Sequence, residues 1–70
     1  MNQCYTAVVK QDGDWWIGWV QEVPGVNCQE RTREALMTSL RATLAEALDM
    51  NRSEAREAAG ADYEELTIAV

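Results

Sequence analysis

Apolar side chains cluster in two short segments near the start of the chain. Cys4–Val9 (CYTAVV) and Trp15–Gln21 (WWIGWVQ) are rich in β-branched and aromatic residues, a composition typical of strands. Gln11–Asp14 lies between them and contains Asp12 and Gly13, which favour a tight turn. The two segments are therefore predicted to pair as a β-hairpin.

A second turn and a short third strand are predicted next. Pro24 cannot donate a hydrogen bond to a sheet, and Gly25 readily adopts turn conformations, so Val23–Gly25 should end the second strand. Val26–Gln29 carries only a weak strand signal, but turn residues flank it on both sides. We expect it to form a short third strand.

Leucines recur every four residues in the middle of the chain, which indicates one apolar stripe on a helix. They are Leu36, Leu40, Leu44 and Leu48. Thr32 is the expected N-cap, because its hydroxyl can accept a hydrogen bond from a free N–H of the first turn. Glu34 complements the positive end of the helix dipole. The helix is predicted to run to about Leu48 and to place its leucines in the core.

The last third of the chain is more polar. Asp49–Asp62 is alanine-rich, and Ser53 is a possible cap for a short helix that Gly60 would end. A mobile loop is the alternative for this segment. Glu65–Val70 (ELTIAV) alternates, so it is predicted to be a last strand. Its apolar side carries Leu66, Ile68 and Val70.

These elements predict one α+β domain, residues 1–70, of β-β-β-α-β order. A helix that joins two strands of one sheet makes a right-handed crossover and leaves those strands parallel. The last strand should therefore lie parallel to the first. The expected architecture is a four-stranded mixed sheet with one long helix on one face.

Both faces of the second strand are apolar. Trp15, Ile17 and Trp19 point one way, while Trp16, Gly18 and Val20 point the other. One helix covers one face, and soluble monomers rarely leave tryptophans exposed in a contiguous patch. The pattern does not say which face the helix covers. A partner or a second copy should cover the other face, unless the short Ser53–Ala59 segment folds over it. The candidate interface residues are Trp15, Trp16, Trp19, Ile68 and Val70.

Size and charge narrow the range of partners. A chain of 70 residues buries only about 60% of its unfolded surface, so a homodimer or higher homo-oligomer is expected to add stability. The net charge of −6 opposes direct binding to nucleic acid and suits a basic protein partner, although it also serves solubility. The apolar run Trp15–Val20 is far shorter than the ~20 residues that cross a bilayer, so no membrane association is expected.

The residue types argue against catalysis and metal binding. The chain has no histidine and two cysteines, whereas a structural zinc site needs about four such ligands. Its carboxylates fall in turns and at strand ends, not on strands where they could hold two metal ions. No catalytic, metal or cofactor site is expected, and the chain is interpreted as a non-enzyme. Nothing at the N-terminus resembles a signal peptide, so Cys4 and Cys28 are expected to be buried free thiols in the cytoplasm. A disulfide between them is the alternative.

The segment Tyr5–Leu36 resembles the N-terminal module of the HicB antitoxin family. The shared features are a Tyr-containing first strand, an Asp-Gly turn, an aromatic-x-Gly-aromatic-Val second strand, a Pro-Gly turn and a Thr-x-Glu-Ala-Leu helix start. The resemblance implies a partial RNase H-like fold and a complex with a small basic HicA-like toxin that cleaves mRNA. Family members commonly continue into a DNA-binding domain after the position of Val70, so operator binding by this chain is not expected. Glu30 stands where the family often has glycine, which implies either a different backbone angle there or one that glutamate tolerates.

Three functions follow as hypotheses. The first is an antitoxin-type module that neutralises a HicA-like toxin by forming a complex. The second is an orphan homo-oligomeric module of the same fold with no toxin partner. The third, a small-molecule sensor beside the tryptophans, is weaker because no polar groups converge there to orient a ligand.

Overall fold

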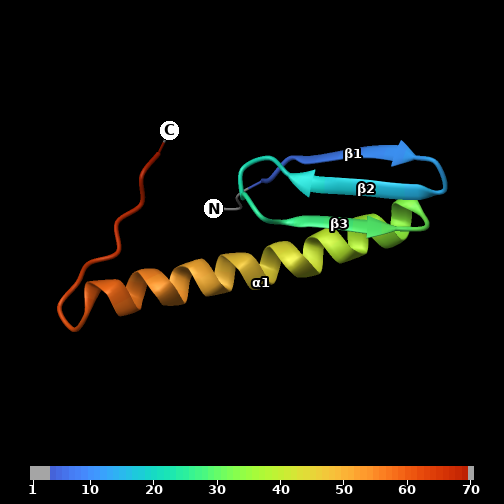
Figure 1. Cartoon of the computed structure of the whole chain (residues 1–70). Helices are drawn as coiled ribbons and strands as arrows, with labels where there is room; N and C mark the ends of the chain where they lie inside the picture. The colour runs from blue at the N-terminus through green and yellow to red at the C-terminus, as the bar shows by residue number, and fades with distance from the viewer. Residues whose placement is uncertain (1–3, 70) are drawn as a thin grey trace.

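Three antiparallel strands precede one long helix in the computed structural model, which describes residues 4–69 (Figure 1). The strands are β1 (Ala7–Asp12), β2 (Trp15–Val20) and β3 (Asn27–Glu30), and the helix is α1 (Arg33–Ala59). The sheet has the order β1-β2-β3 and α1 packs on one of its faces, mainly against β2 and β3. The α+β class and the single long helix predicted from the sequence are confirmed.

The predicted hairpin forms with a two-residue loop. Asp12 pairs with Trp15 and Ala7 pairs with Val20, so Gly13 and Asp14 alone connect the strands. Gly13 has a φ of 62°, and a glycine with positive φ in the first loop position is typical of type II′ hairpin turns. Because the loop is so short, β1 continues to Asp12, three residues past the predicted end at Val9. It begins at Ala7, three residues after the predicted start at Cys4.

The second turn also contributes to the core. Gly25 has a φ of 91°, and the Val20 N–H donates to the Val26 carbonyl at 3.0 Å, which closes the loop between β2 and β3. Val20, Val23 and Val26 are all buried. The predicted Pro24–Gly25 turn is confirmed, and β3 starts one residue later than predicted because Val26 belongs to this closed loop.

Thr32 caps α1 as predicted. Its backbone is extended, with φ −129° and ψ 157°, and its Oγ1 accepts a hydrogen bond from the Ala35 N–H at 3.1 Å. Glu34 lies in the first turn, where a negative charge complements the helix dipole. The side chain of Thr32 therefore satisfies one of the backbone donors that the first turn of a helix leaves free.

Thr32→Ala is expected to lower the free energy of unfolding by about 1 kcal/mol, because the Ala35 N–H loses its acceptor. Thr38→Ala is the matched control on the same helix. Thr38 is exposed and donates to the Glu34 carbonyl one turn back, so its loss should be close to neutral. Urea unfolding of both variants measures the difference, and equal costs would show that the cap does not stabilise the helix.

The core lies where α1 crosses the sheet. Leu36 and Leu40 are fully buried against Val20, Val23 and Val26. Leu44 and Leu48, the next two residues of the stripe, are only partly buried beside them. The predicted leucine face is thus the core face, and its burial fades along the helix as α1 leaves the sheet.

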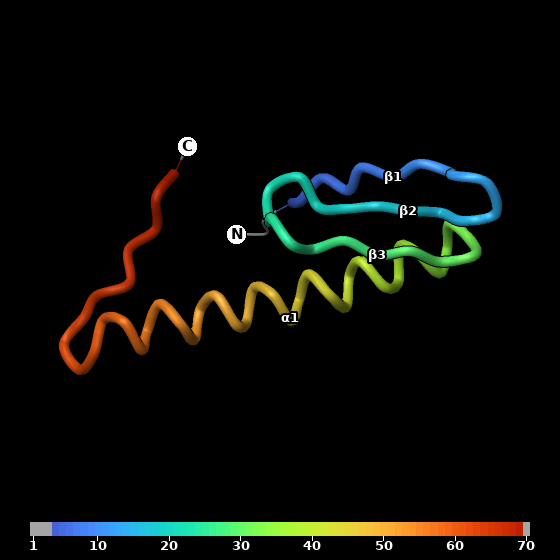
Figure 2. Tube along the Cα trace, viewed as in Figure 1, coloured from blue at the N-terminus to red at the C-terminus, as the bar shows by residue number. Residues whose placement is uncertain are grey.

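The predicted end of the helix near Leu48 is wrong. Helix α1 continues without a break to Ala59, and Ser53 lies inside it and does not cap a separate helix. Adding residues to an existing helix is far easier than nucleating a new one, and the alanines, glutamates and arginines after Ser53 favour helix. Gly60 ends α1 with a φ of 83°, and its N–H donates to the Arg56 carbonyl. We call Asp49–Ala59 the arm, because it extends past the sheet (Figure 2).

The predicted fourth strand is not formed. Residues 61–69, which we call the tail, belong to neither a helix nor a strand and lie apart from the sheet (Figure 1). The described sheet is therefore three-stranded and antiparallel, not four-stranded and mixed. Val70, the last residue of that predicted strand, lies outside the described residues. The arm carries the tail away from the sheet, which local alternation in the sequence does not reveal.

The arm and tail make the molecule elongated. Its extents are 51 × 23 × 15 Å and its radius of gyration is 15.1 Å. A compact domain of this length has a radius of gyration of about 11 Å. The exposed arm and tail account for the difference.

Candidate protein-binding surface

One face of the sheet has no helix on it. A Cβ built on Gly18 would meet Leu36 and Leu40 of α1, so Gly18 faces the helix. Because side chains alternate along a strand, its neighbours on β2 point to the opposite side. Those residues are Trp15, Ile17 and Trp19, and we call the sheet surface around them the open face.

The open face is an apolar strip with polar borders. Trp15 is 37% and Trp19 is 41% exposed, which is high for tryptophan. Val8 on β1 and Asn27 on β3 lie opposite Trp19, Lys10 and Gln29 lie opposite Ile17, and Asp12 lies opposite Trp15. Aromatic residues with a polar rim are typical of protein interfaces, where tryptophan is enriched among the residues that dominate binding.

Arg31 lies over one end of this strip. Its guanidinium carbon is 4.0 Å from the centroid of the Trp15 ring, which is a cation–π contact. The contact orients the Trp15 ring and places a positive charge at the border of the open face. The sequence analysis did not single out Arg31, although a basic residue just after a strand of this sheet was the available signal.

The structure separates the five interface residues predicted from the sequence. Trp15 and Trp19 lie together on the open face, whereas Trp16 points to the other side and packs against the core. Ile68 lies in the tail and is exposed, and Val70 is outside the described residues. The segment Ser53–Ala59, the alternative cover for the open face, is part of the arm and does not reach it. Among the four of these residues that the structure describes, only Trp15 and Trp19 therefore share one surface.

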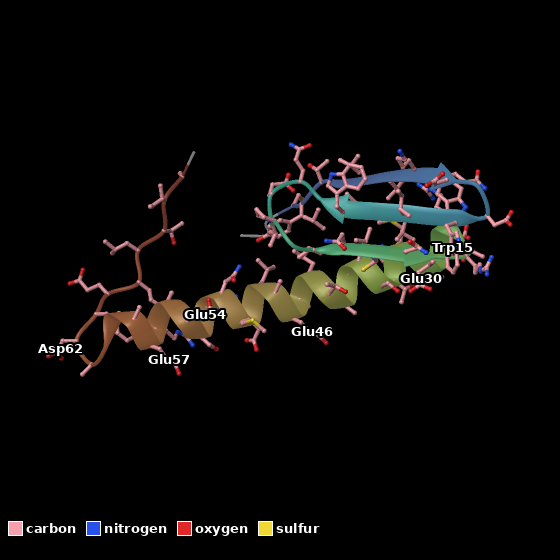
Figure 3. All side chains as sticks on the ribbon, in the orientation of Figure 1. Trp15, Glu30, Glu46, Glu54, Glu57 and Asp62 are labelled. Carbon is pink, nitrogen blue, oxygen red and sulfur yellow. The ribbon has the colours of Figure 1, made fainter. Side chains whose placement is uncertain are left out.

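Negative charge is concentrated away from the open face. Seven of the twelve acidic residues lie at or after Glu46 in the sequence. Figure 3 shows Glu46, Glu54, Glu57 and Asp62 distributed along α1 and the tail. Lys10 and Arg31 border the open face together with Asp12, so the charges beside this face are mixed. A basic partner would therefore be attracted first to the arm and the tail.

Glu22, in the loop after β2, is hydrogen-bonded to the backbone just before β1. The Thr6 N–H donates to Glu22 Oε1 at 2.8 Å, and this hydrogen bond lowers the pKa of the Glu22 carboxyl from its ordinary value. A carboxylate whose pKa is lower when folded stabilises the fold at neutral pH. That contribution is lost as the pH falls through the lowered pKa. Because the contact is fully exposed, it contributes little to the free energy of folding. Its main effect is to position the loop.

The cysteines are free, and only one of them is shielded. Cys4 is exposed, while Cys28 is half-buried with its Sγ 3.4 Å from Thr43 Oγ1. The alternative of a Cys4–Cys28 disulfide is wrong. The prediction of two buried thiols is correct for their reduced state and wrong for the position of Cys4.

Glu30 occupies an ordinary strand position. It is the last residue of β3, and no non-glycine residue in the described chain has a positive φ. Its backbone angle is therefore one that a residue with a side chain readily adopts. Its Oε2 accepts a hydrogen bond from Ser39 Oγ at 2.7 Å, which joins β3 to α1.

Within residues 4–69, no three potential metal ligands among Cys, Asp and Glu gather at one place. No helix in the same part of the chain is both long and apolar enough to cross a bilayer. The surface described above is thus defined by exposed aromatic residues and by charge.

The chain is an α+β protein with a three-stranded antiparallel sheet and one long helix. No family model matches it, and neither a curated protein nor a solved structure is detectably similar to it.

Proposed function

We propose that this chain is a protein-binding module of the HicB antitoxin type, which neutralises a small basic HicA-like mRNA-cleaving toxin by forming a complex. The observation that carries the proposal is the open face. Trp15 and Trp19 are both exposed on this face of β2, on either side of Ile17, and their large rings lose little conformational freedom on binding.

Two further observations support this proposal. The order β-β-β-α agrees with the first four elements that the HicB resemblance implies. The acidic arm and tail suit a basic partner, because opposite charges speed the encounter and help to orient it. The same proposal includes the partial RNase H-like fold, in which a fourth strand is added to the three-stranded sheet described above.

The first experiment is purification of the tagged chain from its native cells, with identification of every co-eluting protein by mass. We expect a small basic protein in near-stoichiometric amount. That protein should cleave mRNA on its own, and the purified chain should suppress the cleavage. Recovery of the chain alone, or of a partner that does not cleave RNA, would contradict the antitoxin function.

Trp19→Ala is expected to weaken toxin binding about 30-fold, the effect of losing one dominant interface residue. Tyr63→Ala is the matched control, since Tyr63 is also an exposed aromatic residue but lies in the tail. Titration calorimetry with the purified toxin measures both affinities. Equal affinities of the two variants would exclude the open face as the binding surface, even if the complex itself forms.

The exposed tail favours a second candidate function, a homo-oligomeric module with no toxin partner. Leu66 and Ile68 are 78% and 84% exposed, which is costly for aliphatic side chains in a molecule that stays monomeric. Purification of the chain by itself, at the mass of a dimer or larger oligomer, supports this second candidate.

A further inference from the structure

The edge of the sheet formed by β1 borders an apolar groove. In the described sheet β1 is an edge strand. Beside it, a groove of about 410 Å³ runs between Tyr5 and Ala7 on the sheet side and Met37, Leu40 and Leu44 of α1. The groove exists because α1 packs mainly under β2 and β3 and leaves the β1 side uncovered.

The tail has the pattern of the strand that would fill this groove. Its residues Glu65–Ala69 alternate, with Leu66 and Ile68 on one side and both highly exposed. A strand added to β1 would point alternate side chains toward α1, where the groove lies. Arg41 also lines the groove, and Glu64, just before this segment, carries the complementary charge. Glu65 is paired with Arg56 of its own arm at 3.0 Å.

The continuous helix prevents the tail from filling the groove of its own sheet. The last helical residue that lines the groove is Leu44, and α1 continues for fifteen residues to Ala59, about 22 Å further at ~1.5 Å per residue. The seven residues Gly60–Leu66, fully extended, span at most about 25 Å. Leu66 would therefore reach no further than the mouth of the groove, and only if the chain ran straight back along the arm without the bend at residues 61–62.

We propose that the tail of one copy pairs with the β1 edge of a second copy as a fourth strand, with Leu66 and Ile68 in the groove of that second copy. The exchange is mutual, so it gives a closed two-fold dimer. It covers both exposed β1 edges, satisfies their unpaired backbone groups and buries the exposed tail leucine and isoleucine.

The proposal does not depend on the antitoxin function. It uses the β1 edge and the groove beside α1, whereas toxin binding was assigned to the open face on the other side of the sheet. Trp19→Ala should therefore weaken toxin binding and leave the dimer unchanged. Loss of the dimer in this variant would contradict tail exchange and indicate association through the open face.

The test is sedimentation velocity of the full chain at micromolar concentrations, with Ile68→Glu and its matched control Thr67→Glu. The wild-type chain is expected to be a dimer. Ile68→Glu places a charge in the groove and should raise the dimer dissociation constant roughly 30-fold or more. Thr67 is on the other side of the same strand, so Thr67→Glu should leave the dimer intact.

Hydrogen exchange of the wild-type chain tests the same pairing without any variant. The amides of residues 65–69 should be protected in the dimer and should lose this protection on dilution to monomer. Two results would overturn the proposal. One is a wild-type chain that is monomeric, whatever the exchange rates of these amides. The other is a dimer whose dissociation constant does not change with Ile68→Glu.

Discussion

Leu40→Ala is expected to leave most of the protein unfolded at 25 °C. Leu40 is 2% exposed and packs between α1 and the sheet beside Gly18. Removing a buried leucine side chain costs about 2–5 kcal/mol. A core of this size rarely supplies more than about 3–5 kcal/mol, so the loss is close to the whole stability.

Met50→Ala is the matched control for this prediction. Met50 is on the same helix but lies in the exposed arm, so its truncation should change the free energy of unfolding by less than about 0.5 kcal/mol. Urea unfolding followed by far-UV circular dichroism measures both variants. They should be compared at one protein concentration, because self-association adds to apparent stability. A folded Leu40→Ala variant with normal stability would show that the leucine stripe is not the core face.

Gly18→Val is expected to lower stability by about 3 kcal/mol, at the upper end of the cost of overpacking. A Cβ at this position would lie 3.0 Å from Val9 Cγ1, 3.1 Å from Leu36 Cδ2 and 3.1 Å from Leu40 Cδ1. These methyl carbons belong to the neighbouring strand and to the helix, so three packed side chains would each have to move by a few tenths of an ångström together. Thermal unfolding of the variant measures the cost.

The smaller change Gly18→Ala allows the cause to be tested by a double-mutant cycle. Val9 provides the nearest atom, so Val9→Ala should relieve part of the crowding that Gly18→Ala introduces. The two changes together should then cost less than the sum of the single costs. Additive costs would mean that Gly18 matters for the strand backbone and not for the approach of the helix.

Most of the local structure could be predicted from the sequence because its signals are local. The turns at Gly13 and Gly25 depend on a glycine with positive φ, and the cap at Thr32 depends on one hydroxyl three residues from its partner. Such features require only neighbouring residues. The strand boundaries and the helix start that depend on them were predicted to within three residues.

The candidate site was predicted only in part. The apolar pattern of β2 predicts that one sheet face is left uncovered, but it does not show that Trp16 lies on the opposite face from Trp15 and Trp19. Gly18 was the available signal, since a glycine inside a strand often marks a close approach by another element. The residues of the groove were missed because Tyr5 and Met37 meet there only after the helix has packed on the sheet.

The length of the helix and the position of the tail were predicted wrongly for one common reason. Each prediction treated a segment by itself: the leucine stripe fades after Leu48, and Glu65–Val70 alternates like a strand. Whether a helix continues depends on elongation from an existing end, which is easier than a new start at Ser53. That continuation then determines how far the tail lies from the sheet.

The hairpin, the two glycine turns, the capped start of the helix and its buried leucines could be predicted from the sequence, because each depends on residues a few positions apart. Which sheet face is covered and where the tail lies depend on how the helix packs on the sheet. Both faces of β2 are apolar, so alternation is equally compatible with either choice. The helix packs on the face of Gly18 because a residue without a side chain lets Leu36 and Leu40 approach the strand. That choice leaves Trp15 and Trp19 exposed on the open face.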